Sequence, residues 1–204
     1  MQLIDLSQTV TDNLPVFPGD DPVLLEQTRF LDTDQYNDHR IEMGMHAGTH
    51  IDGPMHLTAS REYVSELPLD RFMAPGCCLD VRGQPIIQWR PEFARVIPEN
   101  CILLLYTGHD RQFGQSAYFE DYPVLAPEFS RAVVQKRIKM LGLDSPSPDR
   151  PPYLIHRELL QQGIYLIENL TNLAVLAGRE SFEVIALPLK IRANSAPARV
   201  IARI

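Results

Sequence analysis

Short apolar runs, separated by polar and glycine-containing stretches, are the dominant pattern along the chain. Cys77–Val81 and Cys101–Thr107 are almost continuously apolar and end at polar or glycine residues, which predicts buried strands. Arg40–Met45 alternates instead, with its three apolar side chains on one face, and this period of two predicts a further strand. The other predicted strands are Gln2–Leu6, Val23–Thr28, Lys139–Leu143, Ile164–Ile167, Glu183–Leu187 and Val200–Ile204.

Two segments of the second half of the chain have a helical pattern. Glu128–Lys136 follows Pro127, a residue that suits the first turn of a helix, and Leu154–Gln162 is ended by Gly163. Strands therefore dominate the first part of the chain, and strands and helices alternate afterwards. This order predicts one mixed α/β domain that spans residues 1–204. The 17 prolines predict long ordered loops, where functional sites are often built.

Composition and charge narrow the class of protein. The chain is 45% hydrophobic, enough for a core, but it has no apolar run long enough to span a membrane and no basic-then-apolar leader. The formal charge of −7, without a basic cluster, argues against nucleic acid or anionic lipid as a partner. Three cysteines, two of them adjacent, lack metal-type spacing and predict buried thiols in a reducing compartment, the cytoplasm.

One short segment concentrates candidate chemistry. Three of the six histidines, His46, His50 and His56, fall within eleven residues, together with Asp52. All four positions are even, so a straight strand would place them on one face. Isolated histidines beside strands are usually only hydrogen-bonded residues. Several imidazoles and a carboxylate at equal parity favour instead an ion of the zinc or manganese type.

The backbone of this segment has to bend if its side chains are to share an ion. A straight strand would place His46 and His50 roughly 13 Å apart, which is too far for one ion. Gly48 lies between them and permits a bend. The pair Gly53–Pro54 then predicts a second turn before His56. The sequence therefore predicts a metal site on a strand that runs into a loop.

Residues 46–56 resemble the H-x-G-T-H-x-D-x-P-x-H signature of the cyclase family, which includes bacterial kynurenine formamidase and isatin hydrolase. The resemblance covers nearly the whole chain, because further family segments follow in the family's order. They are Leu6-Ser7, Pro18–Asp20, Thr107–Asp110, Gly142–Asp149, His156–Leu160, Ile167–Leu170 and Pro188–Lys190.

The resemblance implies a swivelling β/β/α fold and a binuclear centre of two divalent ions per chain, zinc first and manganese second. His46, His50 and Asp52 would bind the first ion, and Asp52 would bridge to a second ion bound by His156 and Glu168. Without the resemblance, His156 would be interpreted as a helix-surface residue and Glu168 as a carboxylate near the N-terminus of the next turn. The resemblance also implies a homo-oligomer, a homodimer or homotetramer, in which neighbouring chains contribute to the pocket.

The implied activity is hydrolysis of a small-molecule amide. His56 lies beyond the metal motif, and the resemblance implies that it transfers the proton as acid–base catalyst. The expected substrate is an aryl formamide such as N-formylkynurenine, which would give kynurenine and formate. The alternatives are a cyclic amide, as for isatin hydrolase, or another substrate of this family. More remote is a non-catalytic binding protein that has kept the fold.

The substrate pocket is where the chain departs from the family. Phe17 and His109 stand where kynurenine formamidases often have tryptophan, and Leu57 stands where phenylalanine is common. These three residues are the candidates for the pocket. Asp144 and Asp149 are interpreted as parts of a structural loop under the site. The tail around Pro197 matches the family's glycine-rich segment imperfectly.

Overall fold

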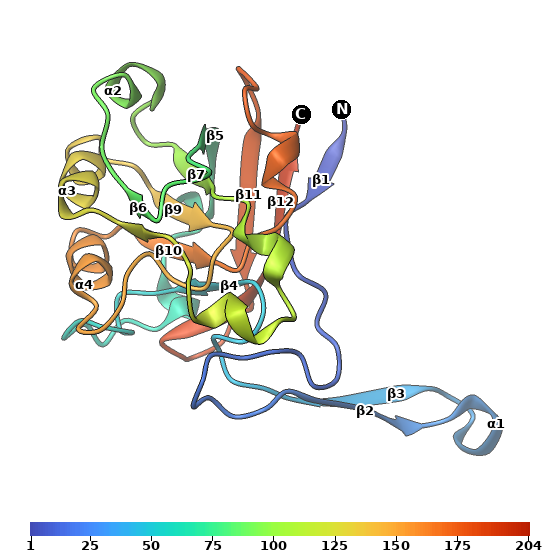
Figure 1. Cartoon of the computed structure of the whole chain (residues 1–204). Coiled ribbons are helices and arrows are strands. Elements are labelled where there is room, and N and C mark those ends of the chain that lie inside the picture. Colours follow the sequence, from blue (N-terminus) through green and yellow to red (C-terminus); the bar gives the residue numbers. More distant parts are fainter.

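The computed structural model describes residues 1–204, and its main feature is a sheet that closes on itself (Figure 1). The strand order is β1-β12-β11-β5-β7-β9-β10-β4, and β4 also pairs with β12, which closes seven strands into a barrel. The run β5-β7-β9-β10 is parallel and the other pairs are antiparallel, so the sheet is mixed. The strands are β1 (Leu3–Asp5), β4 (His50–Asp52), β5 (Met73–Asp80), β7 (Ile102–Tyr106), β9 (Met140–Leu143), β10 (Tyr165–Glu168), β11 (Glu183–Pro188) and β12 (Ser195–Arg203).

The central strand β7 explains why the chain contains continuous apolar runs. Ile102 and Leu104 belong to the core cluster to which the barrel strands contribute. Leu103 and Leu105 belong to a second cluster, which includes the helices packed outside the sheet. Successive side chains of a strand point to opposite faces, so a strand with a core on both sides must be apolar at every position.

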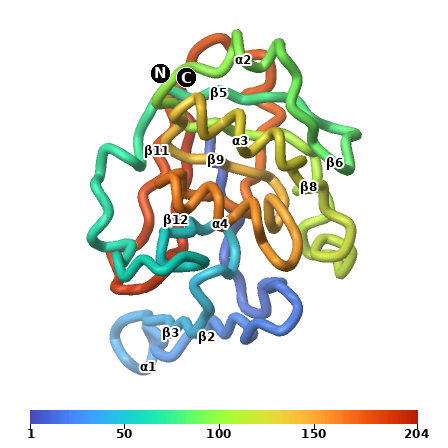
Figure 2. Tube along the Cα trace, turned by 90° about the vertical axis from the view of Figure 1, so that its left-hand side faces the viewer, coloured from blue at the N-terminus to red at the C-terminus, as the bar shows by residue number.

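Two helices cover the outer face of the parallel strands, α3 (Pro127–Gln135) and α4 (Leu154–Gln161) (Figure 2). Each buries residues one helical turn apart, such as Phe129 and Val133 in α3. None of the helices has the length and apolar character needed to cross a membrane. The remaining short elements are α2 (Phe93–Val96), β6 (Ile86–Ile87), β8 (Val124–Leu125), and the 3₁₀ turns η1 (Val64–Glu66), η2 (Leu69–Phe72), η3 (His109–Gln112), η4 (Ser116–Phe119) and η5 (Leu173–Val175).

A two-stranded arm projects from the barrel (Figure 1). It consists of β2 (Leu24–Arg29), α1 (Leu31–Asp34) and β3 (Asp38–Glu42), and every residue of β3 is exposed. The predicted strand over Arg40–Met45 is therefore wrong at its C-terminal end. The chain leaves the hairpin after Glu42, because β3 pairs only with β2, and the residues that follow turn back toward the barrel.

The mixed α/β class predicted from the sequence is confirmed. β12 starts at Ser195, well before the predicted Val200, and its first residues pair with β4. Pro197 lies in this stretch opposite His50, and a proline within a run is normally a sign against a strand. This pairing closes the barrel and brings the start of β12 next to the histidine motif.

Candidate metal centre

The bend predicted between the first two histidines is confirmed. Gly48 has φ +65°, a left-handed conformation that favours glycine, and the rings of His46 and His50 lie with centroids 5.0 Å apart. At Gly53 a Cβ would lie 2.9 Å from the carbonyl oxygen of Asn194, so the chain passes β12 too closely for a side chain. The turn that follows brings the ring of His56 to 4.3 Å from that of His46.

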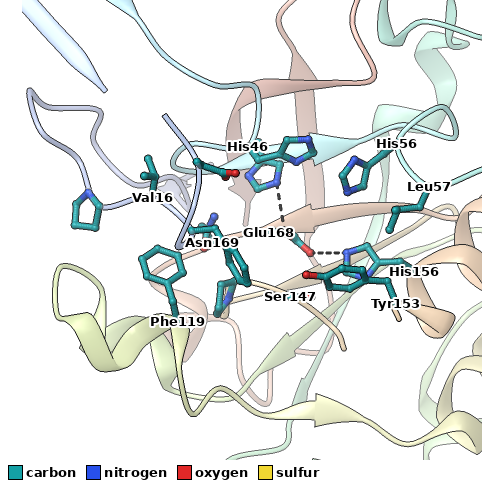
Figure 3. Close-up of a pocket in the computed structure, with 15 residues that line it drawn as sticks. Val16, His46, His56, Leu57, Phe119, Ser147, Tyr153, His156, Glu168 and Asn169 are labelled. Atoms are coloured by element: carbon teal, nitrogen blue, oxygen red, sulfur yellow. Dashed lines mark hydrogen bonds and ion pairs between the residues drawn. The ribbon is translucent and has the colours of Figure 1, made fainter. Parts of the chain in front are cut away.

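Two further candidate ligands reach the same place from distant parts of the sequence. β10 pairs antiparallel with β4, and Glu168 stands opposite His50 in the register. The Nε2 atom of His50 is 3.4 Å from Oε2 of Glu168. His156, on α4, places its Nε2 3.1 Å from Oε1 of Glu168 and 3.9 Å from Oδ2 of Asp52. The structure thus brings together all the predicted ligands, as Figure 3 shows for His46, His156 and Glu168.

Two groups of possible ligand atoms share one carboxylate, that of Asp52. His46, Asp52 and His56 form one group whose ligand atoms lie within 4.8 Å of one another, and His50, Asp52 and Glu168 form another. Asp52 belongs to both groups, as a bridging ligand would. The division differs from the predicted one, in which His46 and His50 bind the same ion. His56 is also close enough to be a ligand itself.

The buried atoms at the centre of the site fit a cation. The Nε2 of His50 and the Oδ2 of Asp52 are buried without a hydrogen-bond partner, although buried polar atoms are nearly always paired. The Nδ1–H of His50 donates to the carbonyl oxygen of Gly48 at 2.9 Å, which leaves the lone pair of Nε2 directed into the site. Histidine ligands usually donate their other N–H in this way. The donor set therefore fits a divalent ion of the zinc type.

The loop under the site supports it at two points. The carboxylate of Asp144 accepts hydrogen bonds from the backbone and hydroxyl of Thr107 and from the backbone of Gly108, and burial raises its pKa to about 6. Asp149 accepts the Nδ1–H of His156 and so leaves the Nε2 of that ring facing the site. Asp149 is thus more than a loop residue, because it fixes the orientation of a candidate ligand.

The charges of the site compensate one another inside the protein. Burial alone would lower the pKa of His50, but the nearby carboxylates of Glu168 and Asp52 raise it to about 9. For His156 burial is likewise outweighed by hydrogen bonds to Asp149 and Glu168, and its pKa is raised to about 10. Burial opposes ionisation of Asp52 and Glu168, yet the neighbouring imidazoles hold the pKa of both below the usual range. A divalent ion would therefore take the place of the protons on these imidazoles.

The pKa of His56 is shifted in the opposite direction, downward. Burial lowers its pKa, and the attraction of the Asp52 carboxylate offsets this only in part. The ring is therefore neutral near pH 7, the state that a proton acceptor needs. His56 thus differs from His50 and His156, whose pKa values are raised, although the three rings belong to the same cluster.

A cavity of about 190 Å³ opens over these residues (Figure 3), smaller than the roughly 300–1,000 Å³ usual for a drug-sized ligand. Phe17 and Leu57 lie in its lining, where the sequence analysis expected them. We call the predicted ligands His46, His50, Asp52, His156 and Glu168 the metal wall. We call the apolar and aromatic residues of the lining, Pro15, Val16, Phe17, Leu57, Phe119 and Tyr153, the substrate wall.

His109 is not in the lining, which corrects the expectation for this residue. It is buried, its Nε2–H donates to the backbone oxygen of Tyr118 at 2.8 Å, and its ring stacks on that of Tyr118 at 4.9 Å. The reason is local, because η3 turns the ring beneath η4 rather than toward the cavity. Its neighbour Tyr118 donates its hydroxyl to Asn169, which does line the cavity.

Two aromatic residues of the substrate wall were missed by the sequence analysis. Phe119 meets Phe17 edge to face, with centroids 5.8 Å apart, and Tyr153 meets His156 in the same way at 5.5 Å. Tyr153 has φ 58°, a left-handed conformation that is uncommon outside glycine and often occurs at functional sites. The position of Tyr153 three residues before His156 was a signal that could have identified it. Phe119 gave no such signal, because its segment carries no motif.

Comparisons with known proteins agree with this geometry. The family described as "Putative cyclase" matches residues 4–150. The kynurenine formamidase of Salinibacter ruber is 30% identical over 211 residues, covering 100% of this chain and 98% of that protein. The kynurenine formamidase of Bacillus cytotoxicus is 30% identical over 208 residues, covering 98% and 96%. The solved structure of isatin hydrolase A from Labrenzia aggregata bound to benzyl benzoate is similar with a TM-score of 0.88 at 26% identity, covering 100% of this chain and 93% of that one.

Proposed function

Because the chain belongs to the cyclase family, we propose that it is a metal-dependent amide hydrolase that acts on an aryl formamide, with N-formylkynurenine as the first candidate. The observation that carries this proposal is the pair of buried, unpartnered atoms, Nε2 of His50 and Oδ2 of Asp52; His50 lines a cavity with aromatic residues in its wall. Full-length similarity to two kynurenine formamidases supports the choice of substrate. The products would be an aromatic amine, such as kynurenine, and formate.

Two divalent ions, zinc first and manganese second, are the cofactors that we propose. His46, His50 and Asp52 would hold one, and Asp52, His156 and Glu168 the other; the shared position of Asp52 in two ligand groups supports this count. When bound, such ions lower the pKa of water and polarise the amide carbonyl.

The other residues of the cavity supply proton transfer and orientation. His56 accepts a proton from the attacking water and returns it to the leaving nitrogen, so that a C–O bond forms, the C–N bond breaks and the amine leaves neutral. Phe17 and Phe119, paired edge to face, offer an apolar surface for the aryl ring. The whole chain, residues 1–204, acts as one domain in this proposal, because β1 and β12, at opposite ends of the sequence, pair with each other.

A cyclic amide is the second candidate substrate. The cavity is small and its lining holds no tryptophan, since the single Trp89 packs on Phe93 and Phe129 elsewhere. A compact fused ring, such as that of isatin, fits this description. The chemistry is the same, and the attack of water on the amide carbonyl opens the ring instead of releasing formate.

The test is a substrate panel with the zinc-loaded and manganese-loaded protein. N-formylkynurenine, formanilide and isatin are compared by kcat/KM, with chelated protein as the control. We expect the formamides to be hydrolysed faster than isatin, with one formate released for each amine. Faster opening of isatin would select the second candidate. No turnover of any compound by the loaded protein would leave a binding protein that has kept the fold.

For the assembly we propose a homodimer or homotetramer in the cytoplasm. The arm exposes Phe30, Leu31 and Tyr36 by 53%, 60% and 55%, and a two-stranded hairpin alone is marginally stable in water. Cover from a second copy would remove this apolar surface from water. The three free cysteines fit a reducing compartment. Light scattering of the purified protein measures the mass, and a strictly monomeric protein would contradict the assembly.

A further inference from the structure

Asn194, which the sequence analysis did not single out, lies between a proposed metal ligand, His46, and the proposed acid–base residue, His56. Asn194 immediately precedes β12, and its backbone oxygen accepts the N–H of Gly53 at 3.0 Å. Its side-chain amide lies 3.2 Å from Nε2 of His46 and 3.2 Å from Nδ1 of His56. One amide therefore touches both a proposed ligand and the proposed acid–base residue.

The proton on His46 decides which end of the amide faces the rings. The Nδ1 of His46 is 3.0 Å from Oδ1 of Asp52, so Nδ1 is the atom that this ring offers to an ion. A neutral imidazole carries a single proton. Once Nδ1 binds an ion, the proton must be on Nε2, which faces Asn194 and needs an acceptor. The oxygen and nitrogen of an amide are nearly equal in shape, so a half-turn of the side chain supplies the oxygen without other movement.

The same oxygen then determines the proton on His56. A carbonyl oxygen has two lone pairs, and the second one faces Nδ1 of His56. The proton of the neutral ring is drawn to Nδ1, and Nε2 keeps the lone pair that a base needs. Without an ion the order reverses. The Nδ1–H of His46 donates to Asp52, the amide N–H groups donate to both rings, and the proton of His56 lies on Nε2.

We propose that Asn194 is a positioning residue whose side-chain amide couples occupancy of the metal site at His46 to the position of the proton on His56. The coupling rests on the metal centre of the proposed function. It does not depend on the substrate, and it holds equally if His56 uses Nε2 as a ligand. In the loaded protein the amide presents its oxygen to both rings, and in the metal-free protein it presents its nitrogen.

The first test reads the protons directly. Protein labelled with ¹⁵N-histidine is studied with and without zinc by long-range ¹H–¹⁵N correlation, above the ordinary histidine pKa of about 6.5. The His56 signals are assigned from their loss in His56→Gln. We expect Nδ1–H on His56 with zinc and Nε2–H without it. The same tautomer in both states, or a protein that binds no zinc, would overturn the coupling. The measurement needs no substrate, so a tautomer switch in a protein that hydrolyses no formamide would count against the proposed activity alone.

Two variants separate an acceptor from a donor. Asn194→Asp keeps an acceptor for both rings and has no N–H, so His56 should carry Nδ1–H with or without zinc, and most of the turnover should remain. Asn194→Leu has neither group, and kcat should fall by roughly 10²-fold with bound zinc and KM unchanged. Asn100→Asp, an exposed asparagine before β7, is the matched control for the added charge and should change neither readout. An Asp variant as impaired as the Leu variant would show that the amide acts as a donor and overturn the inference.

Discussion

The two walls of the cavity are built in different ways. Three of the five residues of the metal wall stand on paired strands, with His50 and Asp52 on β4 and Glu168 opposite His50 on β10. His46 lies in the turn before β4, and His156 on α4. The substrate wall comes from separate loops and turns, with Phe17 in the loop before the arm and Phe119 in η4. Backbone pairing fixes these three side chains of the metal wall, whereas loops and turns carry the side chains of the substrate wall.

This difference means that metal binding and substrate selectivity depend on different parts of the structure. Ligands have to be positioned to within fractions of an ångström, and a hydrogen-bonded ladder with hydrogen bonds behind each imidazole provides that precision. A pocket for an aryl ring needs only an apolar surface of suitable shape, and loops change that surface without disturbing the barrel. Each of the following predictions tests whether a change in one wall leaves the other wall intact.

The largest effect is expected from loss of a ligand. His50→Ala removes the base that faces Asp52 and Glu168, so bound metal and turnover should both be lost. The two carboxylates then remain buried without their partner, and the metal-free variant should lose roughly 3–5 kcal/mol of unfolding free energy. Elemental analysis and urea denaturation measure both effects. His39→Ala, on the exposed strand β3, is the control. Full metal content in His50→Ala would remove His50 from the metal wall.

The affinity for metal should depend strongly on pH. The pKa of His50 is raised to about 9 and that of His156 to about 10 in the metal-free protein, so each of the two ions must displace one proton at neutral pH. The apparent zinc affinity of each site should therefore rise by up to roughly tenfold per pH unit below pH 9, a factor of ten for the one proton displaced.

Metal-free stability should change in the opposite direction. The raised pKa values stabilise the metal-free fold fully below the unfolded histidine value of about 6.5, and this stabilisation is lost as pH rises through about 9 to 10. Competition with a chelator of known pH dependence gives the affinity, and thermal unfolding gives the stability. A flat affinity between pH 6 and 8 would mean that the two imidazoles are already neutral without metal.

A variant of His56 tests whether this residue is a metal ligand or only an acid–base residue. It stands near His46 and Asp52 as a ligand would, but burial lowers its pKa as for a neutral base. His56→Ala should keep its metal and lose activity by roughly 10²-fold or more, the usual contribution of a positioned acid–base group. If elemental analysis finds that one ion is lost, His56 belongs to the metal wall as a ligand.

Much of the fold could be predicted from the sequence, because the spacing of apolar residues along a strand matches the faces that the strand buries. The run Ile102–Tyr106 is apolar throughout because β7 has a core on each side. Barrel closure was not readable, because it depends on β12 pairing with the three-residue strand β4. Three residues are too few to show an alternation of apolar and polar side chains. Pro197 lies in the part of β12 that pairs with β4, and a proline normally argues against a strand.

The candidate site divides in the same way. The histidine motif was visible because spacing and bending residues are local properties, and Gly48 bends the chain as expected. His156 and Glu168 were reached only through the resemblance, because tertiary pairing rather than spacing brings them to His50. Asn194 and Phe119 carry no local signal. Only the closed barrel places Asn194 beside His46 and Phe119 in the cavity lining. His109 was misplaced because sequence position does not show which way a short turn directs its ring.

The smallest effect is expected on selectivity, and it tests the substrate wall by itself. Phe119→Leu keeps an apolar side chain but removes the edge-to-face contact with Phe17 and the aromatic surface offered to a ring. An aromatic pair contributes about 0.5–1.5 kcal/mol beyond its buried area, so the ratio of kcat/KM for formanilide over N-alkyl formamide should fall roughly 2- to 12-fold.

Phe113→Leu is the matched control for this variant, because Phe113 also meets Tyr118 edge to face, at 5.1 Å against 4.9 Å for Phe119, but does not line the cavity. Metal content should be unchanged in both variants, since neither residue touches the metal wall. A loss of metal in Phe119→Leu would show that the two walls are coupled through Tyr118 and Asn169, whose amide donates to the same Gly48 oxygen that orients His50. An equal change of selectivity in both variants would place the aryl ring away from Phe119.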